Sequence, residues 1–116
     1  MSSHPAFGEF SDSRGHLQAI ELDLAPFAPR RAFLVTGPPG GAWRGDHHVP
    51  CRQWLLLLQG SVDVKLRAPD GTSQTHRLDQ VGQGLELTAG DFVRYYLRDQ
   101  RCRVIVFADA PYAGKQ

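Results

Sequence analysis

The sequence has little net charge and no long apolar run, and both shortages exclude classes of protein. Its formal net charge at pH 7 is +1, so no overall field draws it to nucleic acid or to an acidic membrane surface. The longest apolar run, Trp54 to Leu58, is far too short to cross a membrane and is typical of a buried strand. We therefore expect a protein that binds neither nucleic acid nor a membrane.

Cysteine is also scarce. Cys51 and Cys102 stand far apart and form no Cys-x-x-Cys motif. Residues 1–10 lack the basic-then-apolar pattern of a secretory signal. We therefore expect reduced thiols in a cytoplasmic protein, with a single disulfide as the open alternative.

Helical periodicity is almost missing, whereas glycine and proline recur at short intervals. Between them lie short runs with strand-like alternation, such as Val62, Val64 and Leu66, which the turn signal Pro69-Asp70-Gly71 follows. The pattern predicts strands over residues 17–24, 31–36, 53–59, 62–66, 75–78, 85–88, 92–97 and 102–108. We predict one all-β domain over residues 1–116, a cupin or double-stranded β-helix jelly-roll barrel whose open mouth binds small ligands.

The run from Trp43 to His48 is the most informative segment. It places a cation, a carboxylate and two imidazoles directly before the apolar strand of residues 53–59. Imidazole titrates near neutral pH and is well suited to move protons. Adjacent histidines are often only polar loop residues, but this context makes the run a candidate active site.

A set of short motifs follows in order along nearly the whole chain. The set consists of Asp12-Ser13-Arg14-Gly15, Leu17, Glu21, Pro26-Phe27, Arg31, Arg44-Gly45 with the histidine pair, Gln53, Gly60-Ser61, Leu78-Asp79, Gly84-Leu85, Asp109 and Tyr112. In the order and spacing of these motifs, the chain resembles the WxcM-like, cupin-fold sugar 3,4-ketoisomerases, which act on nucleotide-linked 4-keto-6-deoxyhexoses. The combination of motifs is more specific than any one of them.

The histidine pair departs from the family pattern, which is Arg-Gly-x-His-Ala-His before a glutamine. Counted back from Gln53, His48 takes the place of the second family histidine. Side chains alternate along a strand, so His47 and His48 cannot both point inward on an unbroken strand. A bulge at Gly45-Asp46 would let His47 take the first place; otherwise Asp46 stands there.

Two other positions differ from the family, and both lie in expected strands. Phe92-Val93 stands where the family has Trp-His, and Phe33 stands where an aromatic hydroxyl is common. The chain also ends soon after Tyr112. We therefore expect the family fold with a diverged active site.

The resemblance implies an isomerase that moves a ketone between C4 and C3 of a dTDP-linked deoxysugar through an enediol or enediolate. Such a reaction needs a base and a group that stabilises the developing oxyanion. His48 is our first choice for the base, with His47 or Asp46 relaying or orienting the proton. Arg44 would stabilise the enediolate or hold the pyrophosphate, because a guanidinium binds such oxygens in a fork.

Four further residues would bind the substrate. Arg31 would hold phosphate, and Gln53 would hydrogen-bond the sugar or an imidazole. Phe33 and Tyr95 would contact the sugar or nucleobase, although core aromatic residues are an equal alternative.

No metal and no cofactor are expected, because the positions comparable to cupin metal ligands offer too few good donors. Those positions hold Asp46, His48, Gln53 and Val93. The resemblance also implies a homodimer that shares strands between subunits and so covers sheet edges. A catalytically silent sugar-binding cupin and a related keto-sugar epimerase remain as alternatives.

Overall fold

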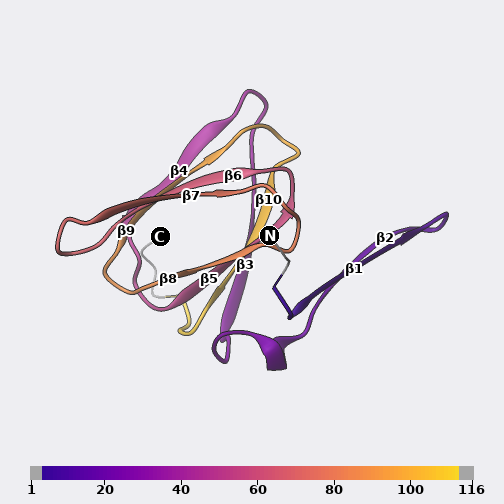
Figure 1. Cartoon of the computed structure of the whole chain (residues 1–116), viewed down its shortest axis with the longest axis horizontal. Coiled ribbons are helices and arrows are strands. Elements are labelled where there is room, and N and C mark those ends of the chain that lie inside the picture. The colour runs from indigo at the N-terminus through magenta and orange to yellow at the C-terminus, as the bar shows by residue number, and fades with distance from the viewer. Residues whose placement is uncertain (1–3, 113–116) are drawn as a thin grey trace.

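The computed structural model describes residues 4–112 and consists almost entirely of strands (Figure 1). None of the helical structure within this part of the chain is long or apolar enough to span a membrane. The elements are β1 (Phe7–Asp12), β2 (Gly15–Ile20), the 3-10 helix η1 (Leu22–Leu24), β3 (Arg31–Thr36), β4 (Ala42–His48), β5 (Gln53–Gln59), β6 (Val62–Arg67), β7 (Ser73–Leu78), β8 (Gly84–Leu87), β9 (Phe92–Leu97) and β10 (Arg103–Ala108).

Two four-stranded antiparallel sheets form the body of the molecule, in the orders β3-β10-β5-β8 and β4-β9-β6-β7. They face one another in Figure 1, and side chains from both sheets form one buried cluster between them. This arrangement confirms the predicted all-β fold. The expected strand over residues 17–24 is shorter than predicted, because it ends at Ile20 and residues 22–24 turn into η1.

Strand β5 places its apolar side chains on two sides of its sheet. Leu55 and Leu57 face the other sheet, whereas Trp54 and Leu56 face the opposite side and pack with Phe107 in a second cluster. β5 lies between β10 and β8 and is not an edge strand. Both of its faces are therefore buried, as its continuous apolar run predicts.

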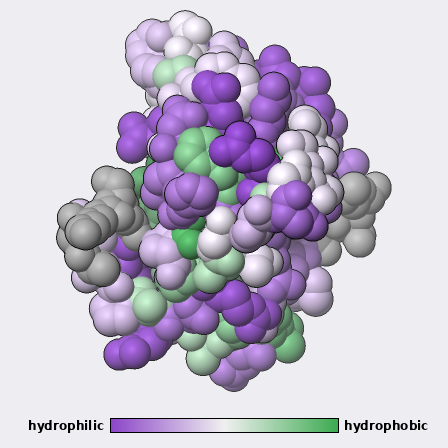
Figure 2. Space-filling model, turned by 90° about the vertical axis from the view of Figure 1, so that its left-hand side faces the viewer, coloured by the Kyte–Doolittle hydropathy of each residue, from purple (hydrophilic) through white to green (hydrophobic). Residues whose placement is uncertain are grey.

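The hairpin of β1 and β2 projects from the body of the molecule (Figure 1). Phe10 and Leu17 pair across this hairpin and are 61% and 57% exposed. On the face of the molecule that Figure 2 shows, hydrophilic residues predominate, with smaller hydrophobic areas between them. The hairpin therefore presents large apolar side chains to solvent.

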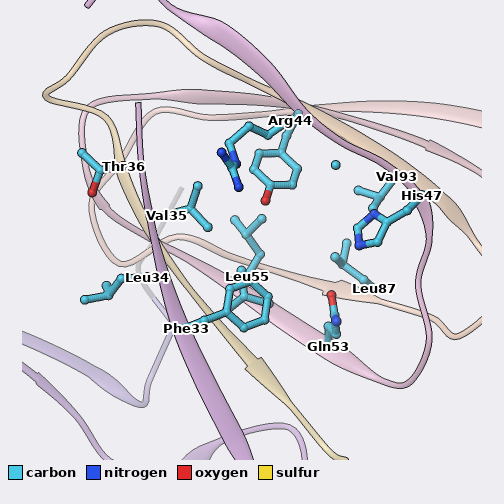
Figure 3. Close-up of a pocket in the computed structure, with 13 residues that line it drawn as sticks. Phe33, Leu34, Val35, Thr36, Arg44, His47, Gln53, Leu55, Leu87 and Val93 are labelled. Atoms are coloured by element: carbon cyan, nitrogen blue, oxygen red, sulfur yellow. The ribbon is translucent and has the colours of Figure 1, made fainter. Parts of the chain in front are cut away.

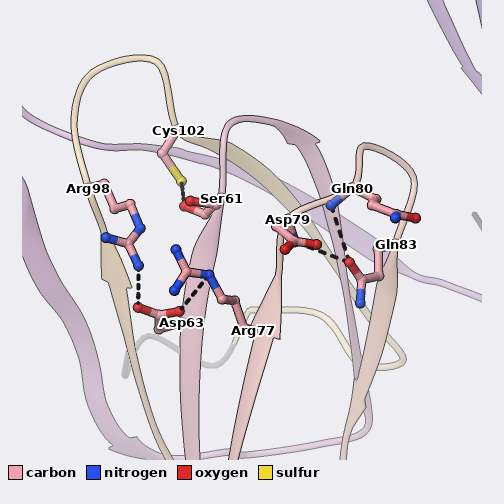
Figure 4. Close-up of polar contacts among 8 residues, drawn as sticks. All are labelled: Ser61, Asp63, Arg77, Asp79, Gln80, Gln83, Arg98 and Cys102. Carbon is pink, nitrogen blue, oxygen red and sulfur yellow. Dashed lines mark hydrogen bonds and ion pairs between the residues drawn. The ribbon is translucent and has the colours of Figure 1, made fainter. Parts of the chain in front are cut away.

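Polar contacts join β6 and β7 to the turn between β9 and β10 (Figure 4). Asp63 lies between two guanidinium groups, with Arg98 Nη2 at 2.9 Å and Arg77 Nε at 3.8 Å from its carboxylate oxygens. The thiol of buried Cys102 donates to the carbonyl oxygen of Ser61 at 3.0 Å. Both cysteines of the chain are free, so the single disulfide that the sequence left open does not form in this structure.

Candidate active site

A cavity of about 520 Å³ lies between the two sheets and is the best candidate for a functional site (Figure 3). Its volume falls within the range of about 300–1,000 Å³ that is typical of small-molecule sites. Apolar and polar side chains both line it, and the polar ones are those of Thr36, Arg44, His47, Gln53 and Tyr95. The lining consists of Phe33, Leu34, Val35, Thr36, Arg44, Gly45, His47, Gln53, Leu55, Leu87, Val93, Tyr95 and Val106.

A β-bulge in β4 decides which imidazole enters the cavity. The register with β9 shifts between Gly45 and His47, so Asp46 is the extra residue. Gly45 and Asp46 have φ values of 91° and 56°, in the left-handed region that a bulge uses. Arg44 and His47 therefore both line the cavity, and of the two alternatives that the sequence left open the structure has the bulge.

His48, our first choice for the base, does not line the cavity. His48 is exposed, its Nδ1 lies 3.2 Å from the carbonyl oxygen of Gly90, and its ring packs edge-on against Phe92. The physical reason is the bulge, because one extra residue reverses the alternation of side chains beyond Asp46. The structure therefore gives no support to His48 as the base.

Asp46 also lies outside the cavity. Its carboxylate pairs with Arg94 Nε at 3.0 Å on the outer face of the β4-β9 pair. This position does not support the expected role of Asp46 in relaying a proton to the histidines. Counted forward from Arg44, the two family histidine places fall on His47 and on Val49, which is buried in the core.

His47 and Gln53 point into the same end of the cavity (Figure 3). His47 is half-buried, and Gln53 is 3% exposed. Within residues 4–112, the buried atoms His47 Nδ1 and Gln53 Nε2 have no hydrogen-bond partner. Buried polar groups are normally paired, so two unpaired nitrogen atoms in one cavity indicate a place for a polar ligand.

Arg44 and Tyr95 form the second polar part of the cavity. They are paired across β4 and β9, and Arg44 lies toward Val35 and Thr36 (Figure 3). Burial raises the pKa of the Tyr95 phenol, while the charge of Arg44 and its hydrogen bond with Tyr95 act in the opposite direction. A guanidinium beside a buried phenol can stabilise negative charge that develops nearby.

Arg31 and Phe33 alternate inward along β3, as the expected register requires. Phe33 lines the cavity, and the Arg31 guanidinium lies 4.7 Å from the ring centre of Phe33 and 4.7 Å from that of Tyr112. Arg31 is not among the lining residues, and its buried Nη1 has no hydrogen-bond partner within residues 4–112. Its expected role in binding phosphate thus requires the ligand to extend beyond the cavity.

The sequence reasoning missed the apolar wall of the cavity. Leu87, Val35 and Val106 line it, and each alternates inward on its strand. The period of two in those strands was the available signal, but it does not distinguish the wall of a cavity from an ordinary core. No group of three or more His, Cys, Asp and Glu side chains capable of holding a metal occurs in the described part of the chain.

Comparisons with known proteins place these features in a family. The family model described as "FdtA: WxcM-like, C-terminal" matches residues 3–116. No curated protein matches the chain. Many solved structures do match it.

The enzyme QdtA, a sugar 3,4-ketoisomerase from Thermoanaerobacterium thermosaccharolyticum in complex with TDP, is 28% identical to the chain. The match covers 92% of this chain and 79% of QdtA, with a TM-score of 0.74. A mutant of QdtA with one histidine replaced by asparagine, in complex with TDP-4-keto-6-deoxyglucose, matches with a TM-score of 0.75 at 27% identity over 94% of this chain and 80% of that one.

The TDP-fucose-3,4-ketoisomerase WlaRA from Campylobacter jejuni matches with a TM-score of 0.72 at 21% identity, over 92% of this chain and 80% of WlaRA. At this identity the likeness supports the fold alone. The family match and the fold agree over nearly the full length of the chain. The chain therefore belongs to the WxcM-like cupin family of dTDP-sugar 3,4-ketoisomerases.

Proposed function

We propose that the protein is a 3,4-ketoisomerase of a dTDP-linked 4-keto-6-deoxyhexose, with His47 as the base. One observation carries the proposal: His47 Nδ1 and Gln53 Nε2 are buried and unpaired in the same cavity, within residues 4–112. A sugar has hydroxyl and carbonyl groups that can pair with both atoms. Family membership supports the reaction class.

The reaction begins when His47 takes the proton from C3, the carbon next to the ketone. The electrons of the broken C–H bond form the C3=C4 double bond, and negative charge develops on O4. Arg44 is an exposed residue that lines the same cavity, and its guanidinium stabilises that charge, because a cation beside the developing oxyanion lowers its energy. The carbon-bound proton then returns at C4, while O3 loses its proton to become the ketone and O4 gains a proton to become the hydroxyl.

The nucleotide would extend from the cavity toward Arg31. The Arg31 guanidinium stacks on Phe33, which lines the cavity, and on Tyr112. A guanidinium binds phosphate oxygens in a fork and is suited to a diphosphate. The TDP and TDP-4-keto-6-deoxyglucose complexes of QdtA support this class of ligand.

We also propose that the protein is a cytoplasmic homodimer and acts without a metal. The exposed pair of Phe10 and Leu17 on the projecting hairpin supports a dimer, because large apolar side chains at a surface favour association. The free thiols of Cys51 and Cys102 are consistent with a reducing compartment.

A catalytically silent sugar-binding protein is the second candidate. Phe33 and Val93, at two positions where the family carries polar groups, both line the cavity. The cavity thereby has fewer proton-transfer groups than the family pattern provides. Binding of substrate without any proton exchange would identify this alternative.

The decisive experiment compares His47→Asn with His48→Asn in deuterium oxide. The protein is incubated with dTDP-4-keto-6-deoxyglucose, and NMR follows both deuterium entry at the carbon next to the ketone and formation of the 3-keto sugar. We expect His47→Asn to lower both rates at least about 100-fold, and His48→Asn to leave them within about threefold. Full activity in His47→Asn would refute its role as base, and loss in His48→Asn alone would reassign that role to His48.

A further inference from the structure

The cavity contains a second side chain that can exchange protons, in addition to His47. Among the described lining residues, His47 and Tyr95 have the side chains that are suited to give up and take up a proton. Tyr95 is 8% exposed, and its phenol is paired with the Arg44 guanidinium. The mechanism proposed above uses His47 as the base and assigns no proton transfer to the Tyr95 phenol.

The proposed isomerisation needs protons to move at oxygen as well as at carbon. When the C3–H bond breaks, O4 gains the electron pair of the ketone and must take up a proton. When the ketone forms at C3, the O3–H bond must break and C4 must gain a proton. A single imidazole can carry the carbon-bound proton, and a second group is needed for the oxygen-bound proton.

We propose that Tyr95 carries the oxygen-bound proton between O4 and O3 while His47 carries the carbon-bound proton between C3 and C4, an inference that rests on the proposed function. The Tyr95 hydroxyl donates its proton to O4 as the enediol forms and becomes a phenolate. The phenolate takes the O3 proton as the C3 ketone forms, and the His47 imidazolium returns its proton to C4. Both residues end in their starting forms, so the steps balance.

The register of β4 and β9 brings the two groups together. Arg44 pairs with Tyr95 and His47 pairs with Val93, so His47 and Tyr95 are diagonal neighbours on one wall of the cavity. Diagonal neighbours in a sheet lie about 7–8 Å apart at their backbones, which lets two long side chains meet one sugar ring. The two proton carriers therefore reach the substrate from the same wall.

Gly45 lies beside the Tyr95 ring and against the backbone of β9. A Cβ atom at residue 45 would lie 3.4 Å from Tyr95 Cε1 and 2.9 Å from the carbonyl oxygen of Val93. The glycine at the bulge thus lets β4 approach the β9 backbone closely beside Tyr95.

The environment of Tyr95 suits a group that gives up and regains a proton. Burial raises its pKa, so the phenol is protonated and ready to donate at neutral pH. Arg44 acts in the opposite direction and stabilises the phenolate while it exists. Phe33, by contrast, lines the cavity without a hydroxyl group.

The test is Tyr95→Phe, which removes one oxygen atom, with Tyr96→Phe as the matched control. Tyr96 is the next residue of β9 but packs against Trp43 outside the cavity. Both variants and the parent are incubated with dTDP-4-keto-6-deoxyglucose in deuterium oxide, and NMR records deuterium entry at C3 and formation of the 3-keto product. Binding of dTDP verifies that each variant is folded.

We expect Tyr95→Phe to form the 3-keto product at least about 100-fold more slowly. Deuterium entry at C3 falls much less, because His47 and Arg44 remain, so the ratio of exchange to product formation rises at least about tenfold. Tyr96→Phe keeps both rates within about threefold of the parent. If Tyr95→Phe forms the product at nearly the parent rate, or if both rates fall equally, the proposed role of Tyr95 is wrong and the proposed function stands. If the parent neither exchanges deuterium nor forms the 3-keto sugar, the proposed function itself is wrong.

Discussion

His47 pairs with Val93 across β4 and β9, and this pairing turns the imidazole into the cavity between the sheets. The next pair along the strands, His48 with Phe92, lies on the outside. The candidate base His47 and the exposed His48 are neighbours in the sequence. The bulge at Asp46 decides which of the two enters the cavity.

Replacing Gly45 by alanine tests the bulge. A Cβ atom would lie 2.9 Å from the carbonyl oxygen of Val93, and the φ of 91° is strained for a residue with a side chain. We expect Gly45→Ala to lower the free energy of unfolding by about 1–3 kcal/mol in urea titrations. Gly8→Ala is the control, because nothing lies within 4 Å of its added Cβ. Equal stability of the two variants would show that the bulge tolerates a side chain.

Replacing Gln53 by methionine should raise the stability of the protein and lower its affinity for the ligand. The change removes the buried amide nitrogen that has no partner within residues 4–112, while the volume stays similar. We expect the free energy of unfolding to rise by about 1 kcal/mol, since an unpaired buried polar group is costly. Affinity for the dTDP-linked sugar, measured by calorimetry, should fall. A variant that is less stable and binds normally would contradict a ligand-binding role for Gln53.

Removing the charge of Arg44 should change the titration of Tyr95. Arg44 lowers the pKa of the buried phenol, against the rise that burial causes. Arg44→Met should therefore move the pKa of Tyr95 further upward. Phenolate absorbance followed through an alkaline titration measures this shift, and the signal of Tyr95 is obtained by subtracting the curve of a matching protein that also carries Tyr95→Phe. An unchanged titration would mean that the two side chains do not interact in solution.

Cys102 should make the protein less stable at alkaline pH. Burial raises the pKa of its thiol in the folded state. A raised pKa contributes stability that is complete below the unfolded pKa of about 8.5 and is lost as pH rises through the folded pKa. Urea unfolding at pH 7 and pH 10 should show a smaller pH-dependent loss of the free energy of unfolding for Cys102→Ala than for the parent.

Cys51 provides the comparison. This half-buried cysteine has a raised pKa for the same main reason, and Cys51→Ala should change the pH-dependent loss of the free energy of unfolding less than Cys102→Ala does. A parent and Cys102→Ala with equal losses would exclude this contribution.

The proposed dimer should depend on the projecting hairpin. Phe10 and Leu17 are exposed and paired, so lysine at both positions places charge where apolar contact would form. We expect the double variant Phe10→Lys with Leu17→Lys to be monomeric in light-scattering experiments at micromolar concentration. Trp43→Lys, which changes an exposed aromatic residue of β4, should leave the dimer intact. Dimers in the double variant, or monomers in the parent, would contradict association through the hairpin.

Several features could be predicted from the sequence because they depend on local pattern. The continuous apolar run in residues 53–59 predicted a strand buried on both faces, and β5 lies between two neighbours with both faces covered. The alternation of Val62, Val64 and Leu66 predicted one buried face, and all three side chains are buried. The polar hairpin strand of residues 7–12 carries no such pattern and was not predicted.

The sequence by itself determined the all-β class, the family and the segment that contains the candidate site, because these follow from alternation, turn residues and the spacing of motifs. Only the tertiary structure decided that His47 rather than His48 enters the cavity, because a bulge arises from pairing with β9 and reverses every side chain beyond it. It also decided that Arg44 lies beside Tyr95, since the two residues are far apart in the chain and meet only through the register of two strands.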